Sequence, residues 1–456
     1  MFWTIVGKEL MDHISSFRFL AIFILTTLLM VTSVLVFSVQ YENAIKEYPR
    51  RVEGLVNEDG KTNLRNVPCR GGATVRRFPS KLVFCSGIGE RELPDQATVA
   101  AHGLRAVRRT GDISDILGSS AYVDWAFVIA VLLSFAAGLL TYKGISGELR
   151  DGTLALMLSN PISRGTVLLA KYLAALIPLA TALSVAALFS LIVLQATGVV
   201  QFTGNDWMKI GLVGLTSLCY LSLFILIGLL CSVFTRSPLI SAVAFLFTWT
   251  CLVFVIPNLG GILARQLGHV KTPLQMKKIA ESIPDQLPLT PGMSDAEVAS
   301  VKLRRELARE RLLTEYVQSL VRQVHLGQNL TRISPASTYS YAVEHIVGGG
   351  TYRLMRFVDN VVRFREGFLR AMIAADKEDP QSLHQYTPWS CGGNRFSQRT
   401  VDLGPAKEFQ DPPPSSMEGL HAAFTDLSLL IFFNGLLFLI TFLRFARQDV
   451  TPAPGV

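Results

Sequence analysis

The chain has 456 residues, of which 50% are hydrophobic and 17% are charged. This balance favours a membrane protein over a soluble enzyme. The net charge of +8 does not indicate nucleic-acid binding, because most lysines and arginines lie in residues 40–122 and 263–426, where acidic residues nearly balance them. We therefore expect no nucleic acid among the partners of this protein.

Residues 1–18 predict an amphipathic helix at the membrane surface. Apolar Phe2 and Ile5 alternate with polar Lys8 and Glu9 at helical spacing. Such a helix lies in the interface with its apolar face toward the lipid. The alternative is an ordinary frayed N-terminus. The apolar stretch that follows is too long for a cleavable signal peptide, so we expect it to stay in the membrane.

Six apolar segments are long enough to cross a hydrocarbon core of about 30 Å as helices. The sequence therefore predicts an α-helical integral membrane protein with six transmembrane helices. The predicted spans are Phe19–Val39, Val123–Thr141, three spans within residues 167–262 (Val167–Thr197, Ile210–Phe234 and Leu239–Ile262), and Leu427–Leu443. Asp124 and Lys171 are expected at membrane edges, where the lysine can snorkel to water. The scarcity of charge deeper in the spans weakens an ion-coupled mechanism.

Basic residues flank the predicted spans on one side of the membrane. They are Lys8, Arg18, Lys143, Arg150, Arg164, Lys171, Arg236, Arg444 and Arg447, against Lys209 alone in the opposite short loop. Short loops rich in Lys and Arg stay in the cytoplasm. Both termini, the loop 142–166 and the tail 444–456 are thus expected in the cytoplasm, and both insertions outside. In a bacterium the location would be the cytoplasmic (inner) membrane.

The first insertion, residues 40–122, is expected to be a small α/β module. Short apolar runs at 73–75 and 82–85 predict strands, and residues 96–108 are expected to form a helix. Cys69 and Cys85 are spaced for a disulfide on the oxidising side of the membrane. Cys391 is also external in this topology, which leaves the pairing open.

The second insertion, residues 263–426, predicts a mainly helical hairpin. Residues 295–326 and 339–376 carry apolar residues at helical spacing, and mutual packing of two helices would explain both stripes. The stripes are Leu303, Leu307, Val317, Val321 and Val324 in the first, and Leu354, Val358, Val361, Phe364 and Phe368 in the second. Gly348–Gly350 is expected to separate helices, and residues 388–416 to lead back irregularly to the last span.

Motifs for ATP binding and catalysis are missing from the sequence. No GxxxxGK[ST] loop, GxSxG elbow or HExxH helix is present. His325, His345, His384 and His421 are scattered, and each is expected at the surface. We assign no catalytic, cofactor-binding or metal-binding residue, so energy has to come from another chain.

The loop 142–166 carries the most informative string of the sequence. It reads Gly-Glu-Leu-Arg-Asp-Gly-Thr-Leu over residues 147–154, continues as Leu-Ser-Asn-Pro-Ile-Ser-Arg over 158–164, and ends in Ala170-Lys171. A simple helical connector would explain its amphipathicity but not this particular string. The string closely resembles the cytoplasmic coupling element of type-2 ABC exporter permeases, and the resemblance extends loosely over the insertions. The permease of the nitrous-oxide-reductase maturation system is a relative of similar six-span plan.

This resemblance implies a coupling site and a set of partners. The residues expected to contact the ATPase are Glu148, Leu149, Arg150, Asp151, Gly152, Thr153 and Leu154. The implied partners are two copies of an ABC ATPase subunit, which would hold ATP and Mg, a second copy of this chain, and the lipid bilayer. Since the loop is expected to be solvated, charge reversal at Glu148 or Arg150 should leave the fold intact.

Export by this permease has one rival interpretation. The chain could be an ATP-driven mechanotransmitter that acts on an extracytoplasmic protein and translocates no substrate. The large external share of the sequence favours this alternative, because motion of the spans would reach an external hairpin through rigid helices. A passive membrane receptor fits poorly with the coupling-like loop. The transported substrate cannot be deduced from the sequence.

Overall fold

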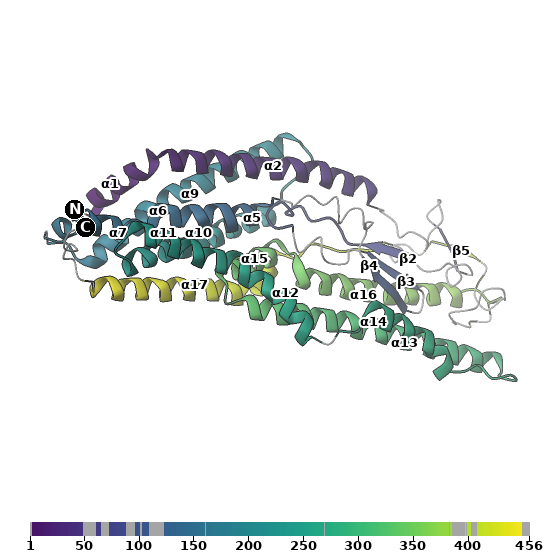
Figure 1. Cartoon of the computed structure of the whole chain (residues 1–456). Helices are drawn as coiled ribbons and strands as arrows, with labels where there is room; N and C mark the ends of the chain where they lie inside the picture. Colours follow the sequence, from purple (N-terminus) through teal and green to yellow (C-terminus); the bar gives the residue numbers. More distant parts are fainter. Residues whose placement is uncertain are drawn as a thin grey trace.

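The computed structural model describes residues 2–48, 61–64, 73–87, 96–100, 103–108, 123–159, 161–268, 270–382, 384, 397, 399–402 and 408–448. Most of them are helical, and the helices lie roughly along one long axis (Figure 1). Both chain ends lie together at one end of the molecule, which we call the terminal end. The strands β2, β3 and β4 lie toward the opposite end, which we call the distal end.

Six described helices are long and apolar enough to cross a membrane, which confirms the predicted helical membrane protein and its six spans. Each predicted span lies largely within one of these helices. They are α2 (Phe17–Glu47), the α5–η1–α6 run (Trp125–Thr141), α9 (Arg164–Ala196), α10 (Gly204–Phe234), the α11–η2–α12 run (Pro238–Leu267) and α17 (Ser416–Ala446). Several extend well past the predicted boundaries, because polar residues continue the helix beyond the apolar stretch.

Helix α10 lies at the centre of the bundle and packs against α6, α9, α11, α15 and α17. Glycines allow the closest approaches. A Cβ at Gly138 on α6 would lie 1.7 Å from a ring atom of Phe245 on α11, and one at Gly228 on α10 would lie 2.0 Å from Oγ1 of Thr141. Small residues at such crossings let membrane helices gain van der Waals contact where lipid offers no hydrophobic drive for association.

Helix α15 (Pro335–Val347) packs among the spanning helices, although it lies within residues 263–426, which were predicted to form the external insertion. The ring of Tyr339 stacks on that of Tyr220 in α10 at 4.4 Å, and the two hydroxyl groups of Tyr339 and Ser217 are 2.9 Å apart. The Ser334 hydroxyl donates to the carbonyl of Leu252 within the π-helical turn η2 (Cys251–Val255). Burial of Ala336, Val343 and Ile346 in the main hydrophobic core holds α15 against the spans.

A buried ionic cluster lies where α14, α15 and α17 meet. Asp426 has no exposed surface, and its Oδ1 lies 2.6 Å from Nε of Arg332. Its Oδ2 lies 3.3 Å from Nδ1 of His345. The expectation of a surface position for His345 was wrong, because the ring is buried beside this carboxylate. His325 and His421 are exposed as expected.

The distal end contains the described strands and the helices α13, α14 and α16. A three-stranded antiparallel sheet has the order β2–β3–β4, from Ala73–Arg76, Gln96–Ala100 and Gly103–Arg108. A second pair joins β1 (Thr62–Asn63) to β5 (Thr400–Val401), and so joins the two insertions. The helix expected over residues 96–108 was wrong. Residues 96–100 instead pair with β2 on one side and β4 on the other, and buried Ala97 between half-buried Gln96 and Thr98 fits a pleated strand.

The two long external helices pack only partly as the predicted hairpin. Val317 and Val321 of α14 (Asp295–Thr331) contact Leu354 and Val358 of α16 (Gly350–Lys377), as expected. The remaining apolar residues of α16 instead cover the sheet and β1. They are Phe357, Val361, Phe368 and Met372, which pack against Leu64, Val75 and Ala97. Mutual packing therefore does not explain both stripes. Leu307 and Val324 of α14 are exposed, and the side chain of Leu303 lies outside the described residues.

Residues 82–85, the second apolar run of the first insertion, form a turn and not the expected strand. This turn lies against the start of α5. The main-chain nitrogens of Trp125 and Ala126 donate to the carbonyls of Phe84 and Cys85, at 2.9 and 3.0 Å. Cys85 has a buried free thiol, while Cys69 and Cys391 lie outside the described residues. The disulfide between Cys69 and Cys85 stays a prediction.

Polar contacts join the bundle to the distal end. The ammonium of Lys209 in α10 is buried and donates to the carbonyl of Pro414 at 2.8 Å, so this residue is not the exposed loop lysine that the sequence predicted. Arg353 at the start of α16 is paired with buried Asp411 at 2.6 Å. Gly348 ends α15 at a φ of 84°, which agrees with the predicted break between helices.

Candidate functional site

Residues 146–158 of the loop form a small ledge at the terminal end. Two short helices make this ledge: α7 (Ser146–Arg150) and α8 (Thr153–Leu158). Gly152 joins them at a φ of 72°, the left-handed region that glycine adopts without strain. A Cβ at this position would meet no atom within 4 Å, so backbone conformation and not crowding accounts for the glycine.

The ledge is fixed to the end of α10 by hydrogen bonds. The main-chain nitrogens of Ile145 and Ser146 both donate to the hydroxyl oxygen of Ser232, at 2.9 Å each. Nearby, the hydroxyl of Ser241 in α11 donates to the carbonyl of Tyr142 at 2.6 Å. These bonds satisfy the free donors and acceptors at the junction between α6 and α7, and they hold the ledge to two spans.

One face of the ledge is buried and the other is open. Leu149 and Leu154 belong to the main hydrophobic core of the bundle, with exposures of 5% and 0%. Arg150 and Asp151 form an exposed pair at 3.0 Å, and Leu156 is 70% exposed. The two leucines therefore anchor the ledge. The open face offers a mixed charged and apolar surface to another molecule.

Beneath the ledge lies a buried charge triad formed by Lys171, Glu9 and Glu148. The ammonium of Lys171 lies 2.7 Å from a carboxylate oxygen of Glu9 and 2.7 Å from one of Glu148. The lysine side chain is only 3% exposed. The predicted snorkelling of Lys171 and the predicted solvated position of Glu148 were both wrong. The triad joins three elements, α1 (Phe2–Ile14), α7 and α9.

Electrostatics inside the triad favour the ionised form of Glu9. Burial by itself raises the pKa of this carboxyl, but the charge of Lys171 and its hydrogen bond outweigh burial and hold the pKa below its ordinary value. Helix α1 also packs against α9 through Val6, Ala170 and Ala174. Apolar and ionic contacts together thus fix α1 against the start of α9.

Arg164 ties the last span to the same region. Its guanidinium Nη1 donates to three carbonyl oxygens at the end of α17, those of Phe445, Ala446 and Gln448, at 2.7 to 3.0 Å. A cation suits this position because the last carbonyls of a helix lack partners and carry partial negative charge. Arg164 belongs to the same string as the ledge, so one loop contacts α1, α9, α10, α11 and α17.

Sequence reasoning found the ledge but missed much of what supports it. The seven predicted contact residues do lie together on α7, α8 and the turn between them. Glu9, Arg164, Lys171 and Ser232 were not expected to contact one another or the ledge. Only one sequence signal pointed to them, namely a lone lysine near the start of a predicted span.

The described residues offer no metal cluster: no group of three or more His, Cys, Asp and Glu among them is placed to hold an ion. Six long apolar helices define a multi-pass membrane protein, with a structured loop at one end. The family model described as ABC-2 family transporter protein matches residues 3–450. The chain belongs to this family and is an ABC transporter permease. Members are membrane components, generally not catalytic themselves, and an ABC ATPase is their general partner. None of the curated proteins compared with the chain matches it.

Proposed function

We propose that this chain is the permease subunit of an ABC exporter in the cytoplasmic membrane, powered by separate ATPase subunits. Two copies of the chain would pair with two ATPase subunits, which hold ATP and Mg. The terminal end would face the cytoplasm and the distal end the outside. We also propose that the chain is related to the permease of the nitrous-oxide-reductase maturation system.

The ledge is the observation that carries this proposal. Its open face presents Arg150, Asp151 and Leu156 at the terminal end, while its buried face is bound to several spans. A push on the open face would therefore reach α1, α9 and α10 directly through the Lys171 triad and Ser232. Such an element can pass motion from an ATPase to the spans.

The orientation is supported by charge. The nine basic residues that the sequence assigned to one side all lie in or beside the helix ends at the terminal end, as the contacts of Arg164 with α17 and of Lys171 with α1 and α7 illustrate. The guanidinium of Arg444 lies 5.2 Å from the centre of the Phe234 ring there. A cluster of Lys and Arg at one membrane face favours the cytoplasmic side.

Helix α1 is proposed to lie on the inner leaflet of the membrane. Its Val6 faces α9, while Trp3 and Met11 are exposed by 73% and 66%, and Phe17 at the start of α2 is exposed by 82%. Large apolar side chains on one side and a triad-bound Glu9 on the other fit an interfacial helix.

The test is purification of the chain with its ATPase partner in lipid nanodiscs. We expect vanadate-sensitive ATP hydrolysis that Arg150→Glu reduces about tenfold, because the change reverses an exposed charge at the contact. Arg322→Glu, an exposed charge reversal at the distal end, is the matched control and should leave hydrolysis unchanged. Equal hydrolysis in both variants would contradict the coupling role of the ledge.

Mechanotransmission is the second candidate, and the joints at the distal end favour it. Arg356 of α16 is paired with Glu418 of α17, and Arg353 is paired with Asp411 just before α17. Motion of α17 would therefore reach α16 through ion pairs rather than through a flexible linker. Breaking the outer pair with Arg356→Glu should stop the external action while ATP hydrolysis continues. Transport of a lipid or solute by the unmodified complex would favour export.

A further inference from the structure

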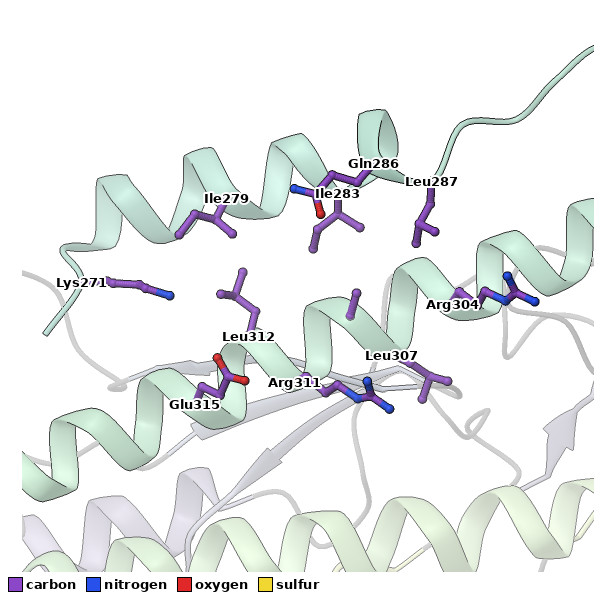
Figure 2. A pocket seen from close by; sticks show the side chains of 11 residues that line it. Lys271, Ile279, Ile283, Gln286, Leu287, Arg304, Leu307, Arg311, Leu312 and Glu315 are labelled. Atoms are coloured by element: carbon purple, nitrogen blue, oxygen red, sulfur yellow. The ribbon is translucent and has the colours of Figure 1, made fainter.

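A groove runs between α13 (Pro273–Gln286) and α14 at the distal end (Figure 2). Its volume is about 540 Å³. The side chains of Ile279 and Ile283 on α13, and of Leu287 just after it, point toward α14. Leu312 of α14 points back across the gap. These apolar side chains face one another across open space, although neighbouring helices normally close such a gap by interdigitation.

Contacts at both ends of the groove hold the two helices in place. On the side nearer the bundle, the side-chain amide of Gln323 in α14 donates to the carbonyl of Gly268, in the segment that leads into α13, at 3.3 Å. On the far side, the Arg305 guanidinium donates to the carbonyls of Leu287 and Pro284, with Nε to Leu287 at 2.8 Å. The groove is therefore fixed at both ends and open along its length.

The rim of the groove is mainly cationic. Lys271, Arg304 and Arg311 line it with a single acid, Glu315. Arg304 and Arg311 are seven residues apart on α14, which places them about 10 Å apart on nearly the same side of the helix. Two arginines at this spacing match two acidic residues one heptad apart on a second helix.

We propose that this groove binds an amphipathic helix of an extracytoplasmic protein, with apolar anchors in the groove and acidic residues at Arg304 and Arg311. The extracytoplasmic location rests on the proposed topology. Leu and Ile anchors spaced by three or four residues would fill the space between Ile283 and Leu312, as in other helix-in-groove complexes. The cationic rim would select an acidic partner and speed its association.

Position and shape favour a helix over a lipid. Along α14, the groove begins about 25 Å and ends about 42 Å from Arg332, the residue of the buried cluster beside α17. A lipid would have to leave the bilayer completely to reach it. The groove is also open along its side, so it would leave an acyl chain partly in water, whereas a helix covers it with its own polar face.

The experiment measures binding of a fluorescent peptide to the full chain in nanodiscs. The probe is a peptide of about 18 residues with Leu at helical spacing and Glu on the flanks, compared with a scrambled isomer of equal composition. We expect Leu312→Glu to weaken binding about tenfold, since it places a carboxylate in the groove, and Arg304→Glu with Arg311→Glu to weaken it about tenfold. Leu274→Glu, an exposed position on α13 outside the groove, is the control.

Three results would overturn the proposal. They are equal binding of the scrambled peptide, unchanged affinity in the Leu312 and arginine variants, and displacement of the peptide by a fatty acid at equal concentration. If Leu312→Glu alters the melting of the protein, Ala308→Leu serves instead, because it fills the groove with an apolar side chain and should also weaken binding. The assay contains no ATPase, so its result does not depend on whether the proposed coupling to an ATPase is correct. Labelling of Leu274→Cys from each side of the membrane tests the topology separately.

Discussion

The two ends of this molecule use polar groups in opposite ways. At the terminal end, Lys171 is enclosed by carboxylates from other helices, half-buried Arg164 binds carbonyls at the end of α17, and a short loop becomes part of the bundle. At the distal end, Arg304 and Arg311 stand at the rim of an open apolar groove. An end with satisfied buried charges can pass on a displacement without reshaping. An end with an open groove can accept a further molecule.

Buried charges also occur between the two ends, in a region that we call the joint. Asp426 is enclosed with Arg332 and His345, and Lys209 is enclosed by main-chain carbonyls. Buried charges of this kind cost desolvation energy and do not by themselves make a protein more stable. They do impose one geometry, because any other arrangement leaves a charge unpaired. Variants at these sites can therefore show where the molecule is rigid.

The largest effect is expected at the joint. Asp426→Ala leaves the Arg332 guanidinium and the His345 ring without their buried carboxylate. Removing one partner of a buried ion pair costs about 3–5 kcal/mol of stability. Thermal unfolding in detergent followed by tryptophan fluorescence measures the loss. A melting temperature within error of the unmodified protein would show that the joint is not rigid.

The next effect is expected at the terminal end. Lys171→Met leaves the carboxylates of Glu9 and Glu148 facing each other in a buried site, and we expect a loss of about 3 kcal/mol. Adding Glu9→Gln and Glu148→Gln should restore most of this stability, since no unpaired charge then remains. The same melting assay tests both variants. If the triple variant were no more stable than Lys171→Met, the triad would not be the cause of the loss.

A smaller effect is expected from steric crowding between spans. Gly138→Ala brings a Cβ onto the buried ring of Phe245 and should cost about 1–3 kcal/mol through overpacking. Gly214→Ala on α10, where a Cβ meets nothing within 4 Å, is the matched control. Comparable melting temperatures of the two variants would contradict the close packing of α6 against α11.

The smallest effect concerns pH. Because the pKa of Glu9 is lowered in the folded protein, its ionised form contributes stability that is present above the unfolded pKa. This contribution is lost as pH falls through the lowered folded pKa. The melting temperature of the unmodified protein should thus fall more steeply on acidification than that of Glu9→Gln. Parallel pH profiles of the two proteins would exclude this contribution.

The sequence by itself determined the class of this protein. Apolar length alone predicts six spans, because a helix has to satisfy its own backbone hydrogen bonds in lipid. The ledge was also predictable, since glycines and proline mark its limits along the chain. The full length of the helices was less predictable. Helix α10, for example, includes Lys209, which precedes the predicted span. Polar residues continue a helix equally well outside lipid, and hydropathy cannot detect them.

Only the tertiary structure decided which residues meet. Residues 96–108 were taken for a helix because β3 has only 5 residues and is stabilised by pairing with β2 and β4, which a local pattern does not reveal. Lys171 looked like a membrane-edge lysine because its carboxylates come from Glu9 and Glu148, far away along the chain. Likewise His345 and Asp426 are brought together only when α15 returns to the bundle. Pairing of buried charges depends on long-range packing, which local spacing does not encode.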